Sequence, residues 1–300
     1  DLHHEARRQR QMCIRDRNMN SVVQDFEQGQ LDRRANIDTR DEIGQLAGSF
    51  NQMADTIVAN MEELKKTDQI RRELIANVSH DLRSPLASIK GYLETLQIKE
   101  KDLTTETRRE YVDTILNITN GLEGLVEQLF ELSKLDAMQV QPQLEPFSIA
   151  DLVQDVVMKF KAVADNSNIQ LKAEMADQLP QVFADIGLIE RALSNLIDNA
   201  LRYTPEGGTV NIGIESTNKK VQVYVSDTGY GIDKKELPLI FDRFYRVEKS
   251  RAKTTGGSGL GLAITKKILE IHKSKIDVES KINVGTTFSF NLDAWGPAFS

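Results

Sequence analysis

The chain has 300 residues, of which 40% are hydrophobic and 28% charged, so it is long enough for about two globular domains and lacks the composition of a disordered protein. Its 45 acidic residues outnumber 38 lysines and arginines, and the net charge of −7 argues against general nucleic-acid binding, which depends on neutralised phosphates. Cys13 is the only cysteine, which excludes an internal disulfide and a cysteine-based metal site.

The N-terminal region predicts two short helices joined by a connector. Residues 1–17 are basic and show no apolar period, so they stay unassigned. A first helix is expected to end at Gly29. Neither a secretory signal nor an apolar window of about 18 residues occurs, and we therefore expect a cytoplasmic chain. Further on, apolar residues spaced 3, 4, 3 and 4 apart form the heptad seam of helices that pair in parallel: Ile43, Leu46, Phe50, Met53 and Ile57.

Two longer helices are expected next. The first begins near Asp68, and Pro85 should bend it, because proline removes a helical hydrogen bond. The second has the strongest period of the chain, with spacings of 4, 3, 4, 3, 4 and 3: Tyr111, Ile115, Ile118, Leu122, Leu125, Leu129 and Leu132. This stripe is wider than one partner helix can cover. We therefore expect an all-α hairpin that dimerises into a four-helix bundle.

After Gln141 the pattern changes to mixed α/β. Segments of strand length and segments of helical period follow one another without a regular β-α-β repeat, which favours an α+β two-layer sandwich over a doubly wound sheet. The strand-like segments are 168–175, 209–216, 221–227, 275–280 and 286–292, and the helical ones are 151–163, 186–202 and 260–272.

His80 has the clearest chemical setting of the histidines. It lies two residues from both Val78 and Leu82, and two residues turn a helix by about 200°, so its ring should face away from the apolar stripe. Asp81 follows, and Ser84 lies one turn further on. An exposed imidazole beside a carboxylate can act as a nucleophile. Taken alone, an ordinary surface histidine is the simpler interpretation.

Two glycine-rich runs suggest phosphate binding. DTGYGI begins at Asp227 and closes a strand-like segment, and GGSGLGL begins at Gly256 and opens a helical one. Backbone amides at such helix starts suit phosphates, although neither run is a P-loop or a dinucleotide fingerprint. The basic residues between the runs are either an ordinary solvated loop or a mobile lid over a polyphosphate: Arg243, Arg246, Lys249, Arg251 and Lys253.

Asn195 and Asn199 lie four residues apart, on one face of a predicted helix. Carboxamide oxygens are suitable ligands for Mg²⁺, which usually takes few protein groups and completes its shell with substrate phosphates and water. Two satisfied polar residues remain the alternative.

Together these runs resemble the cytoplasmic core of a bacterial two-component sensor histidine kinase, from Asp68 to Leu292 and in the family's order. ANVSHDLRSPLASIKGYLETL resembles the phosphoacceptor box, ALSNLIDNALRYTPEGG the asparagine box, IFDRFYR the phenylalanine box, and DTGYGID and GGSGLGLAI the two glycine boxes. DEIGQLAGSFNQMAD resembles the second helix of a HAMP signalling linker. The resemblance implies a HAMP-like linker over 18–66, a dimerisation and phosphoacceptor domain over 67–140, and a GHKL-type ATP-binding domain over 141–300.

The resemblance also implies an ATP-dependent, magnesium-using kinase that phosphorylates itself on a histidine and passes the phosphoryl group to a response regulator. The parent protein would be a membrane-anchored homodimer. His80 would accept the phosphoryl group with Asp81 as the assisting base, Asn199 would bind magnesium, and Asp227 would recognise the adenine amino group. The other nucleotide-site residues would be Asn195, Arg202, Tyr203, Gly229, Gly231, Arg243, Arg246, Gly257, Gly259, Leu260 and Gly261.

Two features leave alternatives open. Ser84 stands where family members that dephosphorylate their partner usually carry threonine or asparagine, so phosphatase activity stays open. An ATP-hydrolysing clamp of the same fold would carry a glutamate at the position of Asn195, and a kinase-dead dimeric scaffold would not need the intact boxes. In the kinase interpretation the ATP-binding domain must swing toward His80, and the linker Gln139–Pro146 is the expected hinge.

Overall fold

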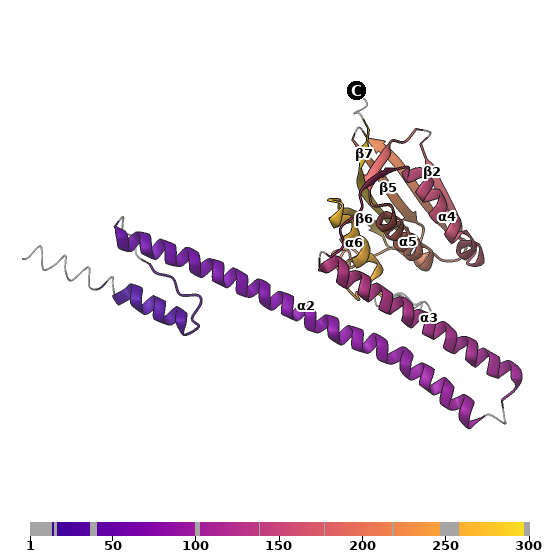
Figure 1. Ribbon diagram of the computed structural model, residues 1–300, viewed down its shortest axis with the longest axis horizontal. Helices are drawn as coiled ribbons and strands as arrows, with labels where there is room; N and C mark the ends of the chain where they lie inside the picture. Colours follow the sequence, from indigo (N-terminus) through magenta and orange to yellow (C-terminus); the bar gives the residue numbers. More distant parts are fainter. Residues whose placement is uncertain are drawn as a thin grey trace, which may run out of the picture. The chain divides into compact units, whose positions relative to one another are not determined.

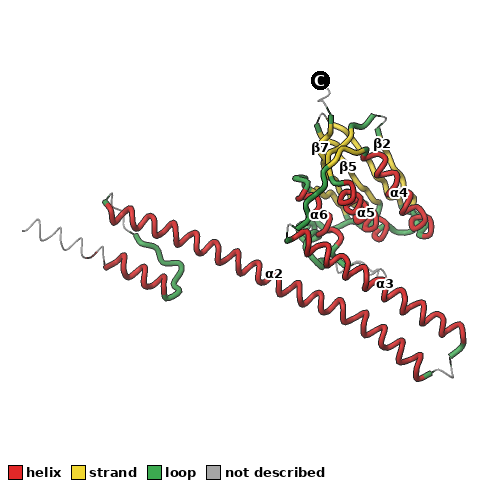
Figure 2. Tube along the Cα trace, in the orientation of Figure 1, coloured by secondary structure: helices red, strands yellow, loops and turns green. Residues whose placement is uncertain are grey.

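The computed structural model describes residues 14, 17–36, 41–99, 103–137, 139–176, 178–217, 219–246 and 258–296, without the side chains of residues 70, 71, 73 and 74. The chain divides into two compact units, Asp1–Ala76 and Asn77–Ser300. Helices make up the N-terminal part of the trace, and the α/β layers follow in the C-terminal part (Figures 1 and 2). Every helix in the described ranges is too short or too polar to span a membrane.

The first unit packs a short helix against the start of α2 (Glu42–Ile98). Residues 17–27 are helical, and Gly29 follows with a φ of 93°, where the sequence predicted the helix to end. The rings of Phe26 and Phe50 meet edge to face with centroids 5.6 Å apart. The Asn51 carboxamide holds the connector, because it accepts from the backbone N–H of Ala35 (2.9 Å) and donates to its carbonyl (3.0 Å).

The buried stripe of α2 in this unit differs from the predicted seam. Ala47, Phe50 and Ala54 are buried, whereas Leu46 and Met53 are 53% and 52% exposed. The two alanines are small and let the first helix approach closely, which leaves the larger side chains on the adjacent face. That face is available to a second copy of the chain.

Helix α2 is continuous where the sequence predicted two separate blocks. The stretch between Ile57 and Asp68 contains no glycine or proline, and two glutamates, two lysines, one alanine, one leucine and one methionine in it favour helix. Pro85 lies inside the helix without interrupting it. Because proline has no N–H, the Asp81 carbonyl lacks its usual helical donor.

Helix α3 (Thr105–Asp136) returns along α2 as the second arm of a hairpin, as Figure 1 shows. Tyr92 of α2 and Tyr111 of α3 contact edge to face at 5.2 Å. In one copy the side chains that widen the α3 stripe stay uncovered: Leu116 is 54%, Val126 36% and Phe130 66% exposed.

The second unit also contains a seven-stranded sheet of order β1-β3-β7-β5-β4-β2, with β6 paired to β7. Only β2 and β4 are parallel; the other pairs in the described sheet are antiparallel. The strands are β1 (Glu145–Phe147), β2 (Gln170–Met175), β3 (Gln181–Ala184), β4 (Thr209–Thr217), β5 (Lys220–Asp227), β6 (Ile276–Lys281) and β7 (Gly285–Trp295).

One helical layer packs on the sheet: α4 (Ile149–Asn166), α5 (Ile186–Tyr203) and α6 (Gly261–Ile271). Alternate β5 residues, Val221, Val223 and Val225, are buried and belong to the same core cluster as Leu193 and Leu196 of α5. Figure 1 shows α4 and α5 lying along the sheet. The predicted α+β two-layer sandwich after a helical hairpin is confirmed.

The predicted hinge is shorter than the sequence suggested. Strand β1 pairs with β3, so Pro146, within the expected hinge, belongs to the sheet. The backbone N–H of Gln143 donates to Oδ2 of Asp185 at 2.8 Å, while Oδ1 of Asp185 caps α5 through the N–H of Leu188. Residues 143–147 are therefore fixed to the α/β domain, which leaves residues 137–142 as the connection to α3.

Candidate functional site

His80 lies on an exposed turn of α2 with one ring nitrogen already engaged. Its side chain is 83% exposed, and Nδ1 lies 3.0 Å from Oδ1 of Asp81. A carboxylate can only accept, so the contact favours the proton on Nδ1 and leaves the lone pair on Nε2. The arrangement is that of an oriented nitrogen nucleophile. Ser84, one turn on, is also exposed.

Asp227 closes β5 as a buried carboxylate at the predicted adenine position. It is 8% exposed, and its Oδ1 accepts from the backbone N–H groups of Gly229 (2.8 Å) and Thr286 (3.2 Å). Burial raises the pKa of Asp227, and these two hydrogen bonds oppose the rise. Within the described ranges Oδ2 accepts no hydrogen bond and is not among the fully buried unpaired side-chain atoms, so this largely buried residue keeps one acceptor within reach of an amino group of a ligand.

Two glycines that follow Asp227, Gly229 and Gly231, let the backbone pack closely beside its carboxylate. A Cβ on Gly229 would lie 2.4 Å from the carbonyl oxygen of Tyr203 and 2.7 Å from Oδ1 of Asp227. Gly231 has a φ of 67°, and a Cβ there would lie 2.1 Å from the carbonyl oxygen of Lys281. Neither position can carry a side chain without moving the backbone.

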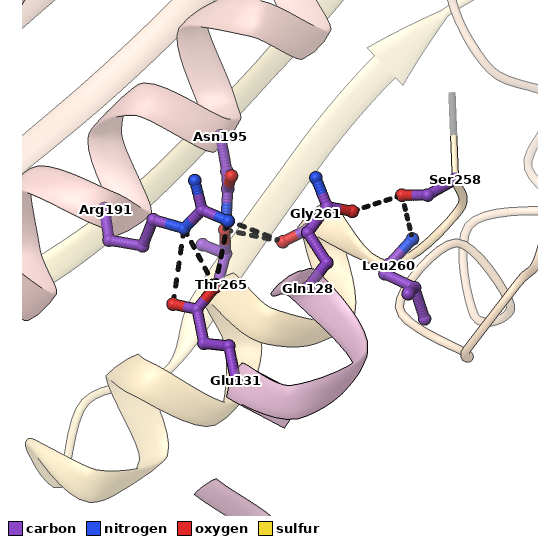
Figure 3. Close-up of polar contacts among 8 residues, drawn as sticks. All are labelled: Gln128, Glu131, Arg191, Asn195, Ser258, Leu260, Gly261 and Thr265. Atoms are coloured by element: carbon purple, nitrogen blue, oxygen red, sulfur yellow. Dashed lines mark hydrogen bonds and ion pairs between the residues drawn. The ribbon is translucent and has the colours of Figure 1, made fainter. Parts of the chain in front are cut away.

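The asparagines on α5 differ in their contacts. Asn195 is engaged within the protein: its Nδ2 donates to the carbonyl of Gly261 at 3.2 Å and lies 3.5 Å from Oγ1 of Thr265 (Figure 3). Asn199 is half-buried and makes no side-chain hydrogen bond to any described residue. A carboxamide oxygen that is partly desolvated and unpaired fits a magnesium ion, which takes few protein ligands. Asn195 instead ties α5 to the first turn of α6.

Of the remaining predicted residues, Arg202, Tyr203 and Arg243 each make a polar contact with another described residue. The guanidinium of Arg202 pairs with Asp198 at 2.9 Å, and the Tyr203 carbonyl accepts from the N–H of Tyr230. Arg246 is exposed, whereas Nη2 of Arg243 lies 2.7 Å from Oδ2 of Asp136 on α3. The predicted site residue Gly257 lies outside the described residues.

Leu260 and its glycine neighbours lie where the second glycine box enters α6. Gly259 has a φ of 69°, and its carbonyl accepts from the N–H of Phe244. The Leu260 side chain is fully buried among apolar residues of α3, α5 and α6. Any contact of Leu260 with a nucleotide would therefore come from its backbone.

The structure joins these residues into local groups. Asp227, Gly229 and Tyr203 are adjacent, as are Asn195 and Gly261. His80 has no hydrogen bond or ion pair with any of them in the described part of the chain. Four further polar residues at the junction of α3 with the sandwich could not be found from the sequence, because their partners are distant along the chain: Gln128, Glu131, Arg191 and Ser258.

Family models match three parts of the chain in order. Residues 17–59 match the HAMP domain and residues 70–137 the His Kinase A (phospho-acceptor) domain. Residues 184–295 match the histidine kinase-, DNA gyrase B-, and HSP90-like ATPase.

Curated relatives extend over most of the chain. It is 31% identical over 259 residues to the sensor-like histidine kinase SenX3 of Mycolicibacterium smegmatis, covering 86% of this chain and 67% of the relative. It is 36% identical over 241 residues to the sensor histidine kinase WalK of Bacillus subtilis, covering 79% of this chain and 39% of WalK. SenX3 of Mycobacterium tuberculosis is covered over 60% of its length. The chain thus spans only part of these proteins.

Solved structures show the same architecture. Histidine kinase ThkA in complex with the response regulator protein TrrA matches with a TM-score of 0.61 at 28% identity, over 74% of this chain and 61% of that one. The Acinetobacter baumannii histidine kinase AdeS shares the fold with a TM-score of 0.59 at 24% identity, over 72% of this chain and 98% of that one.

Proposed function

Because this chain belongs to the sensor histidine kinases, we propose that it transfers the γ-phosphoryl group of ATP to His80 and then to an aspartate of a response regulator. The observation that carries the proposal is the contact between Nδ1 of His80 and the Asp81 carboxylate on an exposed helix turn. It orients the ring so that Nε2 presents its lone pair to solvent.

The transfer step uses this pair directly. The Nε2 lone pair forms a bond to the γ-phosphorus as the bond from that phosphorus to the ADP oxygen breaks. The Nδ1 proton moves toward Asp81, so the phosphorylated ring need not carry a positive charge. Asp81 thus acts as the base that accepts the ring proton.

The sandwich holds the nucleotide. Oδ2 of Asp227 accepts from the adenine amino group, and the absence of side chains at Gly229 and Gly231 lets the adenine ring approach. Arg243 and Arg246 supply positive charge near the phosphates. Asn199 would hold Mg²⁺, which neutralises phosphate charge when it is bound.

An ATP-hydrolysing clamp fits less well. Such a clamp needs a carboxylate base one turn before the metal-binding asparagine, and here that position is Asn195. Its amide donates to Gly261 and Thr265, so it binds within the fold and has no basic group. A histidine acceptor suits this site better than water.

The proposed partners are a second copy of the chain and a receiver domain. The exposed apolar side chains of α3 support the dimer, because two hairpins would cover them. The relative ThkA was solved with a response regulator protein. We also propose a membrane-anchored parent protein, with this chain on the cytoplasmic side, because a HAMP domain precedes the kinase domains.

The test is phosphorylation with labelled ATP and Mg²⁺. The parent chain should acquire a label that acid removes and base does not. His80→Gln should lose the label and keep its affinity for ATP, since the sandwich is unchanged. Undiminished label in His80→Gln would disprove the assignment.

A further inference from the structure

The last turns of α3 leave the hairpin and pack on the α/β domain. Leu132 and Leu135 of α3 are buried at 4% and 1% exposure. They form one apolar cluster with residues of α5 and of the second glycine box and α6: Ala192, Leu260, Ile264 and Ile268. The phosphoacceptor hairpin and the nucleotide domain therefore share a small hydrophobic core.

Polar contacts surround this core. The carboxylate of Glu131 on α3 accepts from Nε of Arg191, at 3.2 Å from Oε1 and 3.0 Å from Oε2. Nη2 of Arg191 lies 2.9 Å from Oε2, so the pair is bidentate. Ser258 donates to Oε1 of Gln128 (Figure 3). Asp136 pairs with Arg243 at 2.7 Å. We call Gln128, Glu131, Leu132, Leu135 and Asp136 the docking face of α3.

The docking face engages residues that the proposed function assigns to the nucleotide. Arg243 is a candidate phosphate contact, and Leu260 lies in the second glycine box. A guanidinium makes the same forked hydrogen bonds to a carboxylate as to a phosphate, so one Arg243 side chain serves one partner at a time. Both members of the Asp136–Arg243 pair are about one-third exposed, at 28% and 33%, and such pairs are weak enough to exchange.

We propose that the docking face of α3 and ATP compete for Arg243, so that nucleotide binding loosens the α/β domain from α3 and docking lowers the affinity for ATP. The proposal rests on the nucleotide site proposed above. By linkage, the factor by which ATP weakens docking equals the factor by which docking weakens ATP binding. An undocked domain is then the one that carries ATP toward His80.

The first experiment measures affinity for a fluorescent ATP analogue with Mg²⁺ in the 300-residue chain carrying His80→Gln, where no phosphoryl transfer occurs. Asp136→Asn should bind the analogue about threefold more tightly, because Arg243 loses its competitor. The matched control is Asp113→Asn, an exposed carboxylate about six turns earlier in α3, which should bind as the parent does. Equal affinities in Asp136→Asn and the parent would overturn the competition.

The second experiment detects docking itself. In a Cys13→Ser background, Gln128→Cys with Ser258→Cys should be joined by a short bifunctional thiol reagent, and saturating ATP analogue should lower the yield. Glu131→Arg should lower the yield without nucleotide, and added Arg191→Glu should restore it. Absent cross-linking, or a yield that nucleotide does not change, would refute the proposal. Neither experiment depends on label at His80, so a failure of the kinase assignment would be seen separately.

Discussion

Asp227→Asn tests the adenine end of the site with little change of shape. The amide oxygen can still accept from Gly229 and Thr286, but an NH₂ group takes the place of Oδ2. That group and the adenine amino group are both donors, so the hydrogen bond is lost and a donor is left unpaired. A lost buried partner costs about 1–3 kcal/mol. At 8% exposure little water can compensate, so we expect about 2–3 kcal/mol, or roughly 30- to 150-fold weaker ATP binding.

Calorimetric titration of ATP and GTP into the parent and the variant measures this effect. Guanine carries a carbonyl where adenine carries the amino group, so the new NH₂ group should narrow the preference for ATP over GTP. Asp277→Asn, an exposed carboxylate of β6, is the matched control and should change neither affinity. An Asp227→Asn protein that unfolds as the parent does and binds ATP as tightly would refute the adenine-reading role.

Three further predictions concern pH, metal and assembly. Burial raises the pKa of Asp227, so the carboxyl takes up its proton at a higher pH in the folded protein than in the unfolded one. The contribution of Asp227 to the free energy of unfolding therefore declines as the pH rises. At neutral pH we expect Asp227→Asn to have a free energy of unfolding no lower than that of the parent. Lowering the pH toward that raised pKa should weaken ATP binding in the parent but not in the variant. Asn199→Ala should lose the magnesium-dependent part of ATP affinity, measured by titration with and without Mg²⁺. If Mg²⁺ raised the ATP affinity of the variant as much as that of the parent, Asn199 would not be a magnesium ligand. Leu122→Asp should dissociate or unfold the dimer in light scattering, since a carboxylate would be buried unpaired, whereas Asn117→Asp on an exposed position should remain dimeric.

The long periodic elements could be predicted from sequence, and the short ones could not. Seven regularly spaced apolar residues identified α3, and alternation identified β5, because burial on one face leaves a period in the sequence. Strands β1 and β3 have 3 and 4 residues, too few to show a period, and proline, which stands at position 146, is uncommon inside strands. Their pairing shortened the expected hinge. The continuity of α2 was missed because the apolar period changes while helix-forming residues fill the gap.

Some of the site residues could likewise be predicted from the sequence, and others could not. His80, Asp81, Asn199 and Asp227 lie in motifs whose local chemistry was visible in the sequence, although their roles stay predictions. The pair Glu131–Arg191 was not visible, since its members are 60 residues apart and charged residues on two helices give no pairing signal. The burial of the Leu260 side chain was missed because a glycine box suggests backbone contacts with phosphate.

The hydrogen bond from Gln143 to Asp185 sets how far the α/β domain can move from the end of α3. The Tyr92–Tyr111 contact places His80 about level with residue 123 of α3, and α3 runs to Asp136, a further axial distance of about 20 Å. The segment between Asp136 and the anchored Gln143, fully extended, spans at most about 25 Å. The anchor point can therefore move back along the hairpin to about the level of His80. The opposite end of the hairpin, near Thr104, lies beyond the reach of the anchor point itself.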